Sequence, residues 1–486
     1  MSGGSAGPTQ TISLREFSVL VKDPRIGPVA ARGQELAGLK DIIGSIIAEL
    51  KAIQAAEDFP GLNHGFPGLI DAGDRGSLLV NENIERSITE LSKLLLKNDT
   101  AATRQFSNAE WRALVRKSLG PPLASIDLDD PLAVDTVRKE VRKALDQARS
   151  KNGDREHAVG CTLFESTDDI QPIRIGPVVI EARHQWLDRM VAEQKMGKVM
   201  AKRIRRKWAG GKLAKRKNAV DQIREKDVLT IVGACPFVCS VKTTGLPPES
   251  GKQKAITASR MALAVAALAW DKPSSALDGF RLLIDQNLRQ LRVLTFEPGK
   301  VTLAGSKLSH LPSGYTFKSG EWQVQAGRLA PLFAAAGEVL DFVTHATGRV
   351  SRPALNNVLM QAVLWFHEAC REAIDAMAVV KFVAVLDGLA CGNGEPEIRA
   401  LLTARVGWGD DDNIYKSGEL KMKHAVARLY GEGRSRTVHG TSDRLSQDWS
   451  DMRGLAETLS PLALLRCLHW FKENSSEDDP AQLRVR

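Results

Sequence analysis

A short polar segment near the C-terminus, Gly431–Gly440, has the sequence GEGRSRTVHG and combines residue types that can do chemistry. His439 can exchange protons near neutral pH, and the guanidinium of Arg434 or Arg436 can hold a phosphate through two hydrogen bonds. On a helix Arg436 and His439 lie side by side, whereas Arg434 and His439 are ~140° apart, an angle that a long arginine can close. Such a set could cleave RNA without a metal. One group would move the proton of the 2′-hydroxyl or of the leaving group, and the other would stabilise the charge of the transition state.

The spacing by itself is weak evidence. Of the nine histidines in the chain, His439 alone has an arginine five positions before it. An arginine at that spacing is nevertheless expected by chance in about half of chains of this composition. The alternative interpretation of the segment is a polar cluster at the joint between two helices.

A second polar residue, Asp387, falls on a helical face that is otherwise apolar. Val380 and Val383 assign its position in the sequence FVAVLDGLACG to the buried side of a helix. Because an unpaired buried carboxylate is costly, we expect a cation near Asp387. The alternative is a partly exposed helix end, since Gly388 and Gly392 indicate that the helix finishes there.

The stretch Lys195–Lys217 is strongly basic, with eleven Lys or Arg and no acidic residue in a chain of net charge +9. Cations that neutralise phosphates release counterions, and an aromatic ring among them can stack on a base, so single-stranded nucleic acid is the expected partner. The alternative is a solvated helix face. The residues predicted to contact nucleic acid are Lys202, Arg203, Arg205, Arg206, Lys207, Trp208, Lys212, Lys215, Arg216 and Lys217.

The sequence patterns around these residues predict a fold that is mostly α. A mixed α/β module lies in the middle of the chain, and an antiparallel helical bundle lies at the C-terminus. Amphipathic periodicity dominates both ends of the chain, and short β-branched runs mark the middle. The predicted parts are a disordered tail (1–10), a helical N-terminal region (11–155), a mixed α/β module that displays the basic segment (156–325), the helical bundle (326–475) and a flexible tail (476–486).

Within these parts the patterns predict individual elements. A helix at Ser417–Tyr430 precedes the polar segment, whose glycines would end the helices that present Arg434 and His439. Two helices follow, the second starting at Ser460. Leu355 and Val383 share one continuous helical phase. Gly120-Pro121-Pro122 is predicted to be a loop, Ser275–Leu294 a helix, and the strands are Ala158–Phe164, Ile173–Glu181, Val228–Val232, Val238–Thr243 and Val301–Leu303.

Composition excludes several classes of function. The chain of 486 residues is 43% hydrophobic and 26% charged, as a globular protein is. No apolar stretch approaches the ~20 residues of a membrane-spanning helix, and the first residues lack the basic start and apolar core of a secretion signal, so we expect a cytoplasmic protein without membrane partners. The six cysteines lack paired CxxC spacing, which predicts buried reduced thiols and no metal site. No glycine-rich phosphate loop is present, and no cofactor is expected.

The polar segment resembles a known signature once its neighbours are included. A helix ending in Leu429-Tyr430, then RSRTVHG, then closing helices, is similar to the HEPN superfamily and specifically to its Apea-like branch. Arg434, Ser435, Arg436, Val438, His439 and Gly440 match the Arg-Ser-basic-apolar-apolar-His-Gly signature of that branch, whereas Thr437 stands where an apolar residue is usual. The segment 379–389 resembles an earlier helix of the branch, with Leu386-Asp387 in place of an Ala-Leu-Glu element. The resemblance covers residues 330–475.

This resemblance implies a bundle of four or five helices that forms a homodimer, in which two Arg-x4-His motifs face one groove. Family members are often metal-independent endoribonucleases that leave a 2′,3′-cyclic phosphate, and many act in defence against phage or as toxins. Arg434 would then position the phosphate of RNA and His439 would transfer protons. Ser435 and Arg436 would support the site, and Asp387 would orient Arg434 or His439.

Two rival interpretations stay open. The first is a non-catalytic HEPN module that binds nucleic acid or a partner protein. The second is a purely structural interaction protein, which gains weight if the basic segment is buried or paired with acids. If the chain is a ribonuclease, residues 1–325 are expected to bind or sense something, such as an unknown regulator or ligand.

Overall fold

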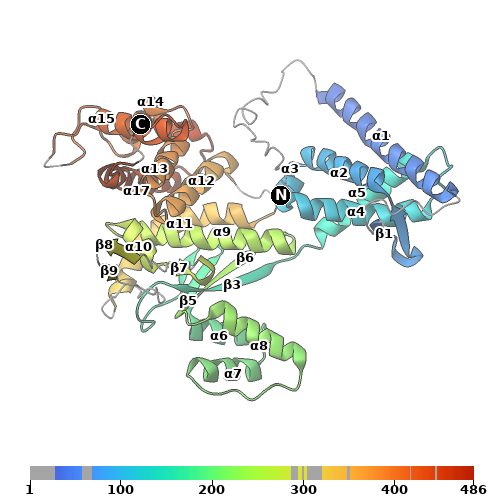
Figure 1. Cartoon of the computed structure of the whole chain (residues 1–486), viewed down its shortest axis with the longest axis horizontal. Helices are drawn as coiled ribbons and strands as arrows, with labels where there is room; N and C mark the ends of the chain where they lie inside the picture. The colour runs from blue at the N-terminus through green and yellow to red at the C-terminus, as the bar shows by residue number, and fades with distance from the viewer. Residues whose placement is uncertain are drawn as a thin grey trace. The chain divides into compact units, whose positions relative to one another are not determined.

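The computed structural model shows a mostly helical chain with a small antiparallel sheet (Figure 1). It describes residues 28–56, 68–285, 294–297, 300–303, 320–346, 351–415, 418–443 and 446–486, and the predicted tail at 1–10 lies outside them. The chain forms two compact units: an N-terminal unit of residues 1–103 and 108–149, and a C-terminal unit of residues 104–107 and 150–486. Across the described ranges, no helix is both long enough and apolar enough to cross a membrane.

The N-terminal unit is built from helices and one hairpin. Its elements are α1 (Pro28–Ala55), β1 (Gly68–Asp71), η2 (Gly73–Arg75), β2 (Ser77–Val80), α2 (Glu82–Lys97), α3 (Thr100–Gln105), α4 (Asn108–Ser125) and α5 (Ala133–Ser150). Asn81 caps α2, because its side chain accepts a 2.9 Å hydrogen bond from the Ile84 N–H. Apolar residues of α1, α2, α4 and α5 form the interior, as the amphipathic patterns predict.

The predicted loop at Gly120-Pro121-Pro122 is wrong, since α4 continues through all three residues. Packing explains the difference. A Cβ on Gly120 would lie 1.9 Å from the carbonyl oxygen of Asp71, so only glycine lets α4 approach the backbone of β1 so closely. The hairpin itself escaped the sequence analysis because its strands of four residues are too short to show a period.

The sheet of the C-terminal unit has five strands in the order β4-β5-β6-β3-β7, and all its pairings are antiparallel. The strands are β3 (Arg155–Thr162), β4 (Ile173–Ile175), β5 (Val178–Ala182), β6 (Phe237–Thr243) and β7 (Arg281–Leu282). The predicted strand Ile173–Glu181 is therefore a hairpin, turning at Gly176 with a φ of +55°. A second hairpin pairs β8 (Leu294–Glu297) with β9 (Lys300–Leu303).

Helices cover both faces of this sheet (Figure 1). Alternation along β6 shows the two faces: Val238 packs with α6 (Arg183–Ala192), α7 (Lys198–Trp208) and α8 (Ala219–Val232), whereas Phe237 and Cys239 join the main core. α9 (Pro248–Ala267) contributes to that core. The predicted strand Val228–Val232 is wrong, because these residues form the last turns of α8 and pack against α6 and α7.

The remaining helices follow α9 in the chain. They are α10 (Pro273–Gly279), η3 (Leu283–Asp285), α11 (Glu321–Thr344), α12 (Pro353–Cys370), α13 (Asp375–Leu389), α14 (Glu395–Arg405), α15 (Met422–Ala427), η4 (Arg428–Ser435), α16 (Arg436–Val438), α17 (Ser450–Glu473) and η5 (Pro480–Arg484). One continuous hydrophobic core runs from β3 through α9 to α17. The predicted division at residue 325 therefore does not separate two compact units.

Three predicted boundaries in this region differ from the structure. The phase shared by Leu355 and Val383 belongs to two helices, α12 and α13, which break at 371–374 and pack on each other. The two predicted closing helices form a single helix, α17, which continues through Pro461. At the predicted break, the Ser460 hydroxyl donates a 3.0 Å hydrogen bond to the Phe382 carbonyl of α13. The predicted helix Ser275–Leu294 ends early, since α10 stops at Gly279 and β7 follows; residues 286–293 lie outside the described ranges, and Leu294 begins β8.

The C-terminal tail is also ordered, contrary to the prediction for 476–486. It contains η5, which is capped by Asp479, and Leu483 is fully buried. The guanidinium of Arg484 pairs with Glu397 of α14. One buried leucine and this ion pair hold the tail on the bundle.

Candidate functional site

The polar segment lies on a continuous helical path through α15, η4 and α16. η4 is a π-helix, and the Arg436 N–H donates to the carbonyl of Gly431, five residues back. The predicted helix Ser417–Tyr430 begins later, at Met422. The glycines of the polar segment do not end this helix, because Gly431 and Gly433 lie inside η4. The path ends at Gly440, whose φ is +69°. π-helical turns are rare and frequently occur at functional sites.

Close packing at Gly433 explains why a glycine occupies the middle of this helix. Gly433 is buried, and a Cβ there would lie 2.7 Å from Cγ1 of Val379 on α13 and 3.2 Å from Sδ of Met452 on α17. η4 can therefore approach α13 more closely than any side chain would allow. This contact brings the next residue, Arg434, to the surface of α13.

Arg434 forms an ion pair with Asp387 of α13. Nη2 of Arg434 lies 3.0 Å from Oδ2 of Asp387, and Asp387 is only 7% exposed. Nη1 of Arg434 donates a 3.4 Å hydrogen bond to the phenol oxygen of Tyr430, one turn earlier, and the centre of the Tyr430 ring lies 5.4 Å from the guanidinium carbon. The expected cationic partner of Asp387 is thus confirmed, and it is Arg434.

The backbone of α13 and the following turn fix the carboxylate itself. Oδ1 of Asp387 accepts a 3.3 Å hydrogen bond from the Gly394 N–H, and α13 ends two residues later at Leu389. The chain then turns through Cys391 and Gly392, both with positive φ. The suggested helix end is therefore real, yet Asp387 stays buried because this turn folds back over it.

The other motif residues point away from the core. His439 and Arg436 are exposed, and the side chain of Arg434 is 33% exposed beyond its ion pair. The His439 N–H donates a 3.0 Å hydrogen bond to the Ser435 carbonyl, so α-helical geometry resumes after the π-helix. Within the part of the chain described, the imidazole of His439 has no hydrogen bond or ion pair. An accessible imidazole and a guanidinium held in place thus lie on consecutive helical turns.

The basic segment is partly paired with acids. Arg203 donates 2.6 Å and 3.0 Å hydrogen bonds to the carboxylate of Glu225, and this pairing lowers the pKa of Glu225. Arg205 pairs with Asp188 of α6, and Arg216 lies 3.1 Å from Asp221 of α8. These three arginines hold α7 and the following loop against α6 and α8.

Trp208 also has a structural environment. Its ring packs against His184 edge to face at 5.7 Å, and the guanidinium of Arg183 lies 5.0 Å from its centre. The ring is half-buried against the cluster under α6–α8, which does not favour stacking on a base. The predicted contacts that are exposed, with no ion pair to the described residues, are Lys202, Arg206, Lys207, Lys212, Lys215 and Lys217.

The basic segment and the motif do not share a site. α7 covers the face of the sheet opposite α9, whereas η4 packs on α13 of the bundle (Figure 1). Residues of 195–217 would therefore meet a different stretch of any ligand that the motif binds.

Metal-ligating residues do not cluster in the described ranges: no group of three or more His, Cys, Asp or Glu side chains is placed to hold an ion. The cysteines are free thiols, five of them buried and Cys391 half-buried, as the sequence predicts in all but the last case. Burial raises the pKa of Cys239 to about 12, so this thiol stays protonated.

Comparison with protein-family models, with curated proteins and with solved structures finds no match for this chain.

Two residues of the site were missed in the sequence. Tyr430 stands four positions before Arg434, a spacing that places both on one helical face, yet the sequence predicts it only as the end of the helix before the motif and not as a contact of Arg434. Gly394 contributes a backbone N–H and has a φ of +86°. No side-chain pattern could have indicated its role, because the group that it offers is present in every residue.

Proposed function

We propose that this chain is a metal-independent endoribonuclease of the HEPN type, with Arg434 and His439 as its catalytic residues. The observation that carries the proposal is the ion pair of Arg434 with the buried Asp387, beside an accessible His439. A guanidinium that is fixed before substrate arrives loses little freedom when it binds a phosphate. A role in phage defence or in a toxin-like system belongs to the same proposal.

The reaction would be an internal transesterification. The 2′-oxygen of a ribose attacks the adjacent phosphorus, and the bond from phosphorus to the 5′-oxygen breaks, which leaves a 2′,3′-cyclic phosphate and a 5′-hydroxyl. His439 would take the 2′-hydroxyl proton or deliver a proton to the leaving oxygen. Arg434 would hold the phosphate oxygens and stabilise their added charge, while Asp387 keeps its guanidinium oriented.

A second copy of the chain would suit this chemistry, because a shared groove could place Arg434 of one copy opposite His439 of the other. Val438, directly before His439, is an apolar side chain that is 52% exposed. Met377, on α13, is 41% exposed. These apolar side chains near the motif are compatible with a symmetric interface that would bring two His439 side chains to one groove.

Activity against total RNA in excess EDTA tests the catalytic assignment. We expect the parent to cut, and Arg434→Ala and His439→Ala to lose at least about 100-fold in rate. Arg428→Ala and His424→Ala are matched controls, since both side chains are exposed on the same helical path outside the motif. Uncut RNA with the parent, or equal cutting by the motif variants, would refute the assignment.

Mixing the two inactive variants tests whether the site is shared between copies. If catalysis joins Arg434 of one copy to His439 of the other, random re-pairing makes half of the dimers mixed, and each mixed dimer keeps one of two sites. The mixture should then regain about a quarter of the parent activity. If the two residues act within one chain, the mixture stays inactive.

The second candidate is a non-catalytic module that binds nucleic acid. The exposed cations around α7, among them Lys202, Lys207 and Lys217, favour this function because they lie far from the motif. RNA binding that weakens steeply with salt, persists in His439→Ala and is accompanied by no cleavage in any variant would support it instead.

A further inference from the structure

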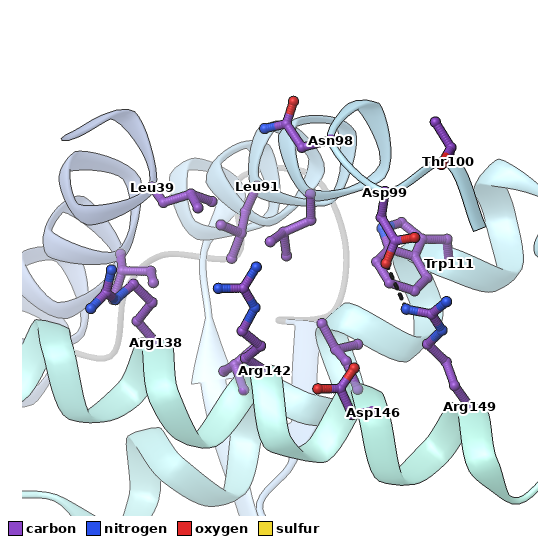
Figure 2. A pocket seen from close by; sticks show the side chains of 14 residues that line it. Leu39, Leu91, Asn98, Asp99, Thr100, Trp111, Arg138, Arg142, Asp146 and Arg149 are labelled. Carbon is purple, nitrogen blue, oxygen red and sulfur yellow. Dashed lines mark hydrogen bonds and ion pairs between the residues drawn. The ribbon is translucent and has the colours of Figure 1, made fainter. Parts of the chain in front are cut away.

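The N-terminal unit contains a cavity of about 480 Å³ that none of the motif residues lines (Figure 2). Its walls come from α1, α2, α4 and α5. This volume falls within the range of sites that take small molecules in proteins. The cavity lies wholly within this unit and therefore requires no contact with the rest of the chain.

Apolar side chains form most of the lining. Ile43, Leu91, Trp111 and Leu145 line the cavity and are each at most 5% exposed over the residue as a whole. The indole N–H of Trp111 donates a 3.0 Å hydrogen bond to the Ser92 carbonyl, which satisfies its polar atom and leaves the ring for packing. The interior would therefore accept an aliphatic or aromatic body.

Charged side chains of α5 stand along one wall. The lining contains three arginines, Arg138, Arg142 and Arg149, and two acids, Asp99 and Asp146. Arg149 is occupied, because its Nη1 lies 2.5 Å from Oδ2 of Asp99 (Figure 2). Arg138 lies 3.0 Å from Asp135.

Arg142 differs from these two arginines. Its guanidinium has no ion pair or hydrogen bond with the described residues, and Figure 2 shows it pointing from α5 toward Leu91 on α2. Arg142 is exposed to solvent and forms no ion pair, although the carboxylate of Asp146 lies one turn further along α5. A guanidinium that stands beside an apolar cavity without such a pair is complementary to a carboxylate or phosphate carried on an apolar body.

We infer that the N-terminal unit binds a small organic anion, a carboxylate or phosphate monoester on an apolar chain or ring. The anionic group pairs with Arg142, and the apolar body lies against Leu91 and Trp111. This inference does not depend on the proposed nuclease activity, since it concerns other residues in another unit. It assigns a chemical class to the ligand that this part of the chain would sense.

Isothermal titration calorimetry on the full chain, with octanoate, octyl phosphate and octan-1-ol as probes, tests the inference. At least one anion should bind about tenfold or more tightly than the alcohol, as expected for one charge-assisted contact. The tighter anion identifies the preferred head group. Arg142→Leu should abolish the preference for that anion, whereas Lys143→Leu, at the next residue of α5, which is equally exposed but outside the cavity lining, should preserve it.

A second variant tests the volume. Leu95→Trp places a larger side chain in the cavity from a partly exposed position, so it should block the anion and the alcohol alike. Circular dichroism confirms that each variant remains folded. The inference is overturned if neither anion binds at millimolar concentration, if the alcohol binds as tightly as the better anion, or if folded Arg142→Leu and Leu95→Trp proteins bind like the parent.

Discussion

Gly433 offers the sharpest test of how the candidate site is built. The change is Gly433→Ala, compared with Gly431→Ala two residues earlier in the same π-helix. An alanine Cβ at 433 would lie 2.7 Å from Cγ1 of Val379 and 3.2 Å from Sδ of Met452, whereas nothing lies within 4 Å of a Cβ at 431. Both changes remove the same glycine flexibility, so their difference isolates the steric contact.

The magnitudes follow from these distances. Overpacking a filled core by one methyl group costs about 1–3 kcal/mol. Replacing glycine by alanine in a helix returns roughly 0.5–1 kcal/mol. We therefore expect Gly431→Ala to be neutral or stabilising, and Gly433→Ala to be less stable than Gly431→Ala by about 1–3 kcal/mol in the free energy of unfolding.

Urea unfolding followed by circular dichroism measures this difference, and a double-mutant cycle locates its cause. Val379→Ala removes the Cγ1 atom that the new Cβ meets, so the cost of Gly433→Ala should shrink when Val379 is already alanine. Equal stability of the two single variants, or a cycle in which the costs simply add, would show that η4 does not pack on α13 as described.

Further predictions concern three other contacts. Arg434→Ala leaves the buried Asp387 carboxylate without its cation and should lower the free energy of unfolding in urea by about 1–3 kcal/mol. This is less than for a fully buried pair, because the guanidinium is one-third exposed and solvent screens its charge. Adding Asp387→Asn should recover part of the loss. Burial, reinforced by the charge of Arg104, lowers the pKa of Lys254 to about 8 from its ordinary value of 10.5. Between these two pH values the unfolded state binds more protons than the folded state, so the cost of burying the charged amine is full below pH 8 and disappears as pH rises to 10.5. Lys254→Met should therefore exceed the parent in stability by about 2 kcal/mol at pH 7, with the gap narrowing as pH rises to 10, and a gap that is constant with pH would exclude this cause. Gly160→Ala should unfold at markedly lower urea concentration, because its Cβ would lie 2.4 Å from the Val232 carbonyl oxygen, a backbone atom that cannot rotate away.

The ion pair at the site illustrates what a sequence can predict. Asp387 was noticeable because a long apolar period surrounds it, and the energetic cost of burying a carboxylate requires a cation. This argument needs only local periodicity and one physical rule. The predicted strands that correspond to β3 and β6 follow for a similar reason, because short runs containing β-branched residues are bounded by turn residues.

Predictions that needed distant contacts were wrong. Val228–Val232 has the composition of a strand, yet it is helical because α8 packs with α6 and α7. Pro461 and the pair Pro121-Pro122 lie inside helices, because packing along those helices outweighs a proline's lost hydrogen bond. The π-helix could not be predicted either, because Gly431 and Gly433 favour the end of a helix. Only the close packing of Gly433 on Val379 explains why a glycine lies within the helix.

At the candidate site Arg434 is held in place, whereas His439 is exposed to solvent. Arg434 owes its position to buried groups: the Asp387 carboxylate, the close approach at Gly433 and the Gly394 N–H that holds Asp387. His439 has none of these constraints within the described residues, and it begins where α-helical bonding resumes. Under the proposed function, a substrate or a second copy of the chain would therefore orient the imidazole. Under the proposed function, mutations that loosen the core near Gly433 should act through Arg434 and weaken RNA binding. Changes around Val438 should act through His439 and lower turnover alone.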